Sequence, residues 1–224
     1  MKNTSTRNSV ITKPGNNDER LNILRELLDA RIEEIADRGL ATSEIAWLES
    51  AWERTQDYYT NGPQGSVSWV LMAAGMELPQ GAFIAGKSPD GQPAYTARGY
   101  MQTPSYPVGT LQVGRTFEFG GAFLGWGWMQ FNSKIYEILV ASPADVCWVP
   151  TKYVLNIAAL GAIPVEGGYE APAGEPLYVA QAFHQRAWRP GKASAQLQGA
   201  FIPFNGSEVC VEEYRVLCYV DPFT

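Results

Sequence analysis

The chain has 224 residues, of which 46% are hydrophobic and 18% are charged, so it can fold around a sizeable core. Its formal net charge is −6, which disfavours a nucleic-acid binder because phosphate contacts need a basic face. The same charge disfavours docking on an anionic membrane. No apolar run approaches the roughly 20 residues of a membrane span. We therefore expect neither nucleic acid nor an integral membrane contact.

The N-terminal part is predicted to be a polar tail followed by a helical hairpin. Residues 1–17 contain no apolar signal-peptide segment and are expected to form a flexible tail. Within residues 18–62, Leu24, Leu28 and Ile35 belong to one apolar stripe with helical spacing. The hairpin either packs on the rest of the chain as a lid or joins copies into a homo-oligomer (a dimer or higher). We favour the homo-oligomer.

From residue 66 to residue 224 the sequence changes to short strand-like segments separated by glycine, proline and asparagine turns. Two similar stretches fill this region, repeat one at about 66–141 and repeat two at about 145–220. They begin near Trp69 and Trp148, and both end in a Tyr-x-(Ile/Val)-Leu strand. The sequence therefore predicts a mainly β fold of two pseudo-symmetric antiparallel units, preceded by the helical hairpin.

The second repeat carries an ordered series of motifs. They are a Gly-Gly-Tyr-Glu loop, a Gly-Glu-Pro-Leu-Tyr-Val strand, a Pro-Gly-Lys turn, a Gly-Ala-Phe-Ile-Pro-Phe segment and a final Tyr-Arg-Val-Leu strand. In this order they resemble the DM-nine repeat, and the resemblance covers about residues 66–220. Tandem pairs of that repeat occur in invertebrate mannose-binding lectins, and in natterin-like proteins they are fused to pore-forming modules.

The resemblance implies that mannose is held by the acid of the Gly-Tyr-acid loop and by the lysine of the Pro-Gly-Lys turn. In this sequence these residues are Glu170 and Lys192, and the two motifs also contain Gly168, Tyr169 and Gly191. A carboxylate accepts and an ammonium donates hydrogen bonds to adjacent sugar hydroxyls. Such a site requires neither a metal nor a cofactor, and we expect none.

The first repeat departs from this pattern. Lys87 or Ser88 stands at the position of Glu170, and Asp90 lies nearby. An almost constant offset between the repeats aligns a Val-Gly-Thr segment with the Pro-Gly-Lys turn, so that Thr110 replaces the lysine. These residues are predicted to form a degenerate second site.

Other residues that could carry chemistry are interpreted as structural. His184 is the only histidine and is expected in a loop after a strand. A multi-histidine metal site is excluded, because one histidine cannot build it. Trp126 and Trp128 alternate and are expected on one face of the core. The cysteines lack metal spacing and are interpreted as buried reduced thiols: Cys147, Cys210 and Cys218.

Acidic residues of the β region are interpreted as solvent-facing charges on strands: Glu118, Glu137, Asp145, Glu208, Glu212 and Glu213. A pair of carboxylates at a set separation could hydrolyse a glycosidic bond, but we expect no such activity.

The sequence thus predicts a lectin-like carbohydrate-binding protein that recognises mannose-type glycans and is not an enzyme. The alternative is a structural or protein-interaction module without a sugar ligand, for instance a toxin accessory or assembly subunit. Because no signal peptide is visible, a cytoplasmic location is expected by default, or secretion by a non-classical route.

Overall fold

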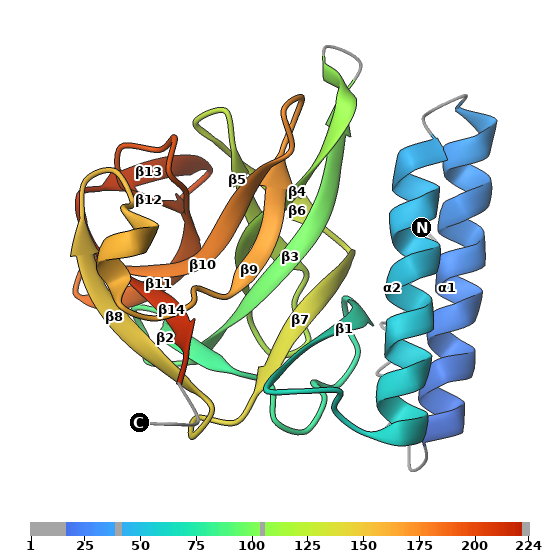
Figure 1. Cartoon of the computed structure of the whole chain (residues 1–224). Helices are drawn as coiled ribbons and strands as arrows, with labels where there is room; N and C mark the ends of the chain where they lie inside the picture. Colours follow the sequence, from blue (N-terminus) through green and yellow to red (C-terminus); the bar gives the residue numbers. More distant parts are fainter. Residues whose placement is uncertain (1–16, 39–41, 104–105, 221–224) are drawn as a thin grey trace, which may run out of the picture.

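Figure 1 shows the computed structural model of the chain, in which two helices stand beside a mainly β domain. The structure describes residues 17–38, 42–103 and 106–220. The expected flexible tail at 1–17 lies outside the described residues except for its last position.

The helices α1 (Asn17–Asp37) and α2 (Thr42–Asn61) form the expected hairpin. Their apolar stripe, which includes Leu24, Leu28 and Leu48, is buried against strands of the first repeat. Burial of this apolar surface stabilises the packing of the hairpin on the β domain of the same chain. Association between copies remains a prediction. None of the helices in the described part of the chain has the length and apolar character that a membrane crossing needs.

The described residues of the β domain form a 14-stranded antiparallel sheet. The strands of the first repeat are β1 (Val67–Ala73), β2 (Ile84–Lys87), β3 (Pro93–Thr103), β4 (Tyr106–Thr116), β5 (Ala122–Trp126), β6 (Met129–Ser133) and β7 (Ile135–Ala141). The strands of the second are β8 (Val146–Lys152), β9 (Glu166–Glu170), β10 (Glu175–His184), β11 (Ala187–Ala193), β12 (Ala200–Phe204), β13 (Ser207–Val211) and β14 (Glu213–Tyr219). A short 3-10 helix, η1 (Ile157–Leu160), lies between β8 and β9.

The two repeats have the same strand order. Hydrogen-bonded neighbours run β1-β7-β3-β4-β5-β6 in the first repeat and β8-β14-β10-β11-β12-β13 in the second. The two series meet where Met129 of β6 pairs with Ser207 of β13. The prediction of two pseudo-symmetric antiparallel units is therefore confirmed.

A closed ring of eight strands joins the repeats. From β4 the neighbours run through β5, β6, β13, β12, β11 and β10 to β9, and β9 returns to β4 where Tyr169 pairs with Leu111. Because β4–β6 belong to the first repeat and β9–β13 to the second, neither repeat can close this ring alone.

Two glycines of the family motifs lie within strands of this ring. Gly168 belongs to β9 and Gly191 to β11, which corrects the expectation that their motifs form a loop and a turn. A Cβ on Gly168 would collide with the Leu111 carbonyl oxygen, and a Cβ on Gly191 would collide with the Phe201 carbonyl oxygen. Both positions therefore require glycine because neighbouring strands approach closely.

Replacing Gly168 with alanine is expected to destabilise the fold by about 1–3 kcal/mol, because the added methyl group meets backbone and the β9–β4 contact must shift. Urea unfolding measures this loss. Gly174→Ala is the control, since its Cβ would meet nothing within 4 Å and only its positive φ of 73° adds a cost. Equal losses in the two variants would contradict the explanation.

Candidate functional site

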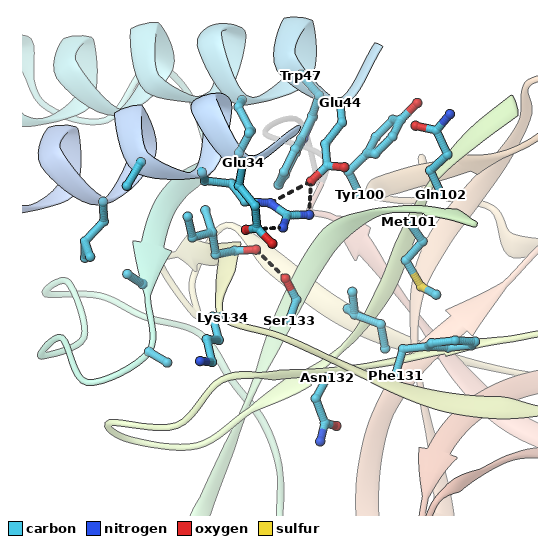
Figure 2. Close-up of a pocket in the computed structure, with 18 residues that line it drawn as sticks. Glu34, Glu44, Trp47, Tyr100, Met101, Gln102, Phe131, Asn132, Ser133 and Lys134 are labelled. Carbon is cyan, nitrogen blue, oxygen red and sulfur yellow. Dashed lines mark hydrogen bonds and ion pairs between the residues drawn. The ribbon is translucent and has the colours of Figure 1, made fainter. Parts of the chain in front are cut away.

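A cleft lies between the helical hairpin and the first repeat (Figure 2). It encloses about 640 Å³, a size typical of small-molecule sites. The helical wall comes from α1 and α2, and the facing wall from β3, β6 and the start of β7. Its polar lining includes Gln102, Asn132 and Lys134, which Figure 2 labels.

Arg31 holds two carboxylates on the helical wall of the cleft. Its Nη1 donates to Glu34 Oε2 at 2.9 Å, and its Nη2 donates to Glu44 Oε1 at 2.7 Å. Burial lowers the pKa of Arg31, but its bonds to Glu44 and Glu34 outweigh burial and raise that pKa. The bond from Arg31 also lowers the pKa of Glu34. Arg31 and Glu34 therefore remain charged at neutral pH.

An aromatic pair, Trp47 of α2 and Tyr100 of β3, adds apolar surface where the two walls meet. The rings of Trp47 and Tyr100 are stacked, with centroids 6.0 Å apart and an interplanar angle of 22°. The Tyr100 hydroxyl donates to Ser43 Oγ at 2.7 Å, and Trp47 Nε1 donates to Glu137 Oε2 at 3.1 Å. With their polar atoms bonded, the two rings are fixed in place beside the carboxylates.

One buried acid joins the helical wall to the sheet, and the sequence did not predict its burial. Glu137 of β7 is fully buried, which corrects its interpretation as a solvent-facing charge. Its carboxylate accepts from Trp47 and forms ion pairs with Arg54 of α2 at 2.9 Å and Arg98 of β3 at 2.7 Å. The available signal was its place in the otherwise apolar strand Ile-Tyr-Glu-Ile-Leu-Val.

The structure does not bring Glu170 and Lys192 together. Glu170 is half-buried at the end of β9, opposite Glu175 of β10. Lys192 lies in β11, opposite Val179 of β10. These two positions of β10 are four residues apart along the strand, so the Cα atoms of Glu170 and Lys192 are on the order of 13 Å or more apart.

Lys192 instead belongs to a buried polar cluster inside the ring, and the residue is 1% exposed. Its Nζ donates to the Gly125 carbonyl oxygen at 2.9 Å and to Gln112 Oε1. It also lies 3.0 Å from Glu208 Oε1, an ion pair outside hydrogen-bond alignment. Glu208 is buried too, which corrects its expected solvent exposure. We call Lys192, Gln112, Gly125 and Glu208 the lysine site.

The remaining candidate sugar-binding residues lie in two places. Tyr169 is 36% exposed on β9, and its carbonyl oxygen accepts from Thr110 Oγ1 at 2.6 Å. Lys87 is exposed at the end of β2, and the Ser88 hydroxyl donates to the Asp90 carboxylate in the following turn. Thr110 thus contacts β9 of the second repeat. Lys87, Ser88 and Asp90 lie apart from it, at the end of β2 and in the turn that follows.

Strand pairing also corrects the alignment of the two repeats. Ala97 and Ala180 each follow the proline of a Gly-x-Pro turn by four residues. Ala97 lies opposite Gly114 in β4, and Ala180 lies opposite Gly191 in β11. A Cβ on Gly114 would collide with a β5 carbonyl oxygen, as one on Gly191 would with a β12 carbonyl oxygen. Gly114, and not Gly109, therefore corresponds to Gly191.

The residue after each glycine then gives the counterpart of Lys192. Arg115 follows Gly114, so Arg115 corresponds to Lys192, and the alignment of Thr110 with Lys192 is wrong. The first repeat retains a buried basic residue at this position, because Arg115 is 7% exposed.

Three other expectations can be compared with the structure. His184 is half-buried at the end of β10, and its ring meets that of Phe204 edge-on at 4.9 Å. Cys218 is buried as expected, but Cys147 is exposed. Trp128 is 65% exposed at the β5–β6 turn, which corrects its expected core position. Within the described ranges, no group of three His, Cys, Asp or Glu residues is placed to hold a metal ion.

Residues 108–211 match the family model described as the DM9 repeat. This stretch begins within β4 and ends with β13, so it includes nearly all of the closed ring. The central part of the chain thus carries a DM9 repeat. The resemblance drawn from the ordered motifs is therefore confirmed. No curated protein matches the sequence.

Among solved structures, the protein is similar to the crystal structure of the nematode sperm cell motility protein MFP2B. The TM-score is 0.50 and the sequence identity is 19%. The match covers 71% of this chain and 49% of that chain, so the protein spans about half the length of MFP2B. At this identity the similarity shows a shared fold alone.

Proposed function

We propose that this protein is a lectin-like protein that binds mannose-type sugars without transforming them. DM9 repeats are associated with carbohydrate-binding lectin-like proteins. The observation that best supports a sugar ligand is the composition of the cleft. The carboxylates of Glu34 and Glu44 and the amide of Asn132 line the same cleft as the Trp47 and Tyr100 rings.

A pyranose offers hydroxyl groups on its edge and C–H groups on its faces. In the proposed complex, the hydroxyls donate to Glu44, bond to Asn132 and accept from the Lys134 ammonium group, and a C–H face packs on the aromatic side of the cleft. Binding of this kind requires hydrogen bonds and apolar contact, and neither a cofactor nor an activated side chain. A homo-oligomer would join several weak sites and raise their combined affinity by about 10²–10⁴.

The family resemblance supports a second sugar contact on β9. Glu170 and the partly exposed Tyr169 are its proposed direct contacts. Gly168 and Gly191 would act by letting strands approach closely, and Lys192 would act from inside the ring by holding β11 in place.

A glycan array followed by calorimetry on the full chain tests the proposal and separates the two sites. Lys134→Ala removes a cleft charge, and Lys152→Ala is its exposed control on β8. Glu170→Ala changes β9, and Glu166→Ala is its control on the same strand. We expect Lys134→Ala to weaken mannose binding by about 2–10-fold, as the loss of one hydrogen bond does.

The outcomes are distinct for each idea. Weakening by Glu170→Ala alone would move the sugar site to β9. Absence of any glycan ligand for the wild type would refute the lectin proposal, and hydrolysis of nitrophenyl glycosides would refute the non-catalytic part.

A structural or protein-interaction module is the second candidate function. The specific observation in its favour is the exposed apolar tip of the β5–β6 hairpin, where Trp128 is 65% exposed and Met129 is 57% exposed. MFP2B is titled a motility protein, and the fold likeness to it is compatible with such a role. Self-association that disappears in Trp128→Ser, together with an empty glycan array, would favour this candidate.

A further inference from the structure

The corrected alignment of the repeats reveals a second buried site equivalent to the lysine site. Lys192 of the second repeat reaches the Gly125 carbonyl oxygen of the first. Its counterpart Arg115 reaches in the opposite direction, from the first repeat to the Pro203 carbonyl oxygen of the second. The two basic side chains therefore make equivalent contacts related by the pseudo-symmetry of the fold.

The acid of the lysine site has a neutral counterpart. Glu208 lies opposite Pro203 in the β12–β13 pair, and Gln130 lies opposite Gly125 in the equivalent β5–β6 pair. An amide thus stands where the lysine site has a carboxylate.

The amide of the lysine site has a charged counterpart. Gln112 lies opposite Gly99 in the β3–β4 pair, and Arg189 lies opposite Ala182 in the equivalent β10–β11 pair. A second guanidinium thus stands where the lysine site has an amide. The lysine site is neutral because its cation is paired with an acid, whereas its counterpart contains two cations.

We call this counterpart the arginine site, and its fourth member is Thr96. Thr96 lies opposite Arg115, at the place that the apolar Val179 occupies opposite Lys192. Each member has a buried polar atom without a hydrogen-bond partner among the described residues: Thr96 Oγ1, Arg115 Nε, Gln130 Oε1 and Arg189 Nη2. Because buried polar groups are nearly always satisfied, this concentration indicates a partner other than the chain itself.

The charge of the arginine site indicates the sign of that partner. Arg115 is 7% exposed and Arg189 is 2% exposed, and in the part of the chain that the structure describes neither forms an ion pair. Burial, and secondly the nearby charge of Arg189, lower the pKa of Arg115 to about 10, so Arg115 remains protonated at neutral pH. Burial also lowers the pKa of Arg189. Two buried like charges are unfavourable unless an anion joins them.

The surroundings orient both guanidinium groups. Arg189 Nε donates to the His184 carbonyl oxygen at 2.9 Å, and its guanidinium lies 4.4 Å from the centre of the Phe204 ring. Arg115 lies 5.4 Å from the centre of the Phe123 ring. Both phenylalanines are half-buried, so the two rings that lie against the guanidinium groups reach the surface of the ring.

We propose that the arginine site binds a small oxyanion that carries a hydroxyl group, with the chemistry of hydrogen phosphate. Arg115, Arg189 and the Thr96 hydroxyl donate to its charged oxygens, and Gln130 Oε1 accepts from its hydroxyl. Free phosphate has this chemistry at neutral pH, and a phosphate monoester shares it in its singly protonated form. The proposal is independent of sugar binding in the cleft.

The test is calorimetry and thermal unfolding of the full chain with inorganic phosphate, methyl phosphate and sulfate. Phosphate is expected to bind and to raise the unfolding temperature, because it binds the folded state alone. Sulfate is expected to act more weakly, since it has no hydroxyl at neutral pH to donate to Gln130. Stronger binding of methyl phosphate than of phosphate would assign the site to esters, and the reverse would assign it to the free ion.

Gln130→Glu is the decisive variant, because it supplies the carboxylate that the lysine site has in Glu208. It is expected to weaken phosphate binding by at least about tenfold and to raise the unfolding temperature without phosphate. Gln56→Glu makes the same charge change at an exposed position of α2 and should leave both measurements unchanged. Arg189→Gln restores the residue type of the lysine site and should also weaken binding.

The proposal is overturned if phosphate neither binds nor stabilises the wild type. It is also overturned if Gln130→Glu and Arg189→Gln bind phosphate as tightly as the wild type does. Equal binding of sulfate and phosphate would overturn the assigned role of Gln130.

Discussion

Glu137→Ala is expected to lower the free energy of unfolding by about 3–5 kcal/mol, the range measured when one partner of a buried ion pair is removed. Glu137 is fully buried, and its carboxylate meets Arg54 and Trp47 of α2 and Arg98 of β3. Without the carboxylate, the two guanidinium groups repel each other and the Trp47 N–H loses its acceptor. The variant therefore weakens the attachment of the helical hairpin to the sheet.

Urea unfolding of the full chain measures the loss, and limited proteolysis shows whether the hairpin detaches first. Glu49→Ala is the control, since it removes an acid from the exposed side of α2 and should leave the unfolding midpoint near that of the wild type. A Glu137→Ala midpoint equal to that of the control would contradict the anchoring role.

The same residue gives a prediction for acid pH. Burial raises the pKa of Glu137, but Arg98 and then Arg54 outweigh burial, so its pKa lies below the ordinary value of 4.5. A depressed pKa in the folded state means that the stabilising contribution is fully present above the unfolded pKa. It is lost as the pH falls through the folded pKa. The stability of Glu137→Gln should accordingly fall less steeply below pH 4.5 than that of the wild type.

The sequence was sufficient for the architecture because its signals are local. The helical spacing of Leu24 and Leu28 predicts the hairpin, and the glycine and proline turns predict short strands. The ordered motifs of the second repeat predict the family. Each of these signals lies within a few tens of residues of sequence.

The register between the repeats could not be obtained in the same way. Gly114 lies 17 residues after Ala97, whereas Gly191 lies 11 residues after Ala180, so the first hairpin is six residues longer. Gly109 lies within the longer β3–β4 hairpin, and a linear alignment of the two repeats wrongly pairs it with Gly191. Only strand pairing distinguishes the two glycines, and with them Arg115 from Thr110 as the counterpart of Lys192.

The burial of polar residues was also beyond the sequence, because the partners are distant along the chain. Glu137 meets Arg54 from 83 residues away, and Lys192 meets Gln112 from 80 residues away. Alternation along a strand shows which residues share a face, but it does not show what covers that face. The helical hairpin covers Glu137, and ring closure covers Lys192.

Lys192→Ala is expected to destabilise the protein by about 3–5 kcal/mol, because it leaves the Glu208 carboxylate inside the ring without its cation. Glu208 is 5% exposed, so water cannot replace the ammonium group at little cost. Gln112 and the Gly125 carbonyl oxygen also lose their donor. Urea unfolding measures the effect, with Lys87→Ala at an exposed position of β2 as the control.

A double-mutant cycle identifies the cause of this loss. Adding Glu208→Gln to Lys192→Ala replaces the unpaired carboxylate with a neutral amide, which costs less to bury. The double variant should therefore recover part of the lost stability, with an interaction energy of about 1–3 kcal/mol between the two positions. Strictly additive losses would show that the ion pair contributes nothing to the ring.

This cycle also decides what a loss of sugar binding in Lys192→Ala would mean. If binding returns in the double variant together with stability, Lys192 supports the fold and the sugar lies elsewhere. If stability returns and binding does not, Lys192 contacts the sugar directly, and the ring must open to admit it. Loss of sugar binding in Lys192→Ala alone could come from a lost sugar contact or from a weakened fold. Lys192 is the residue that the family resemblance assigns to mannose, and it also joins the two repeats.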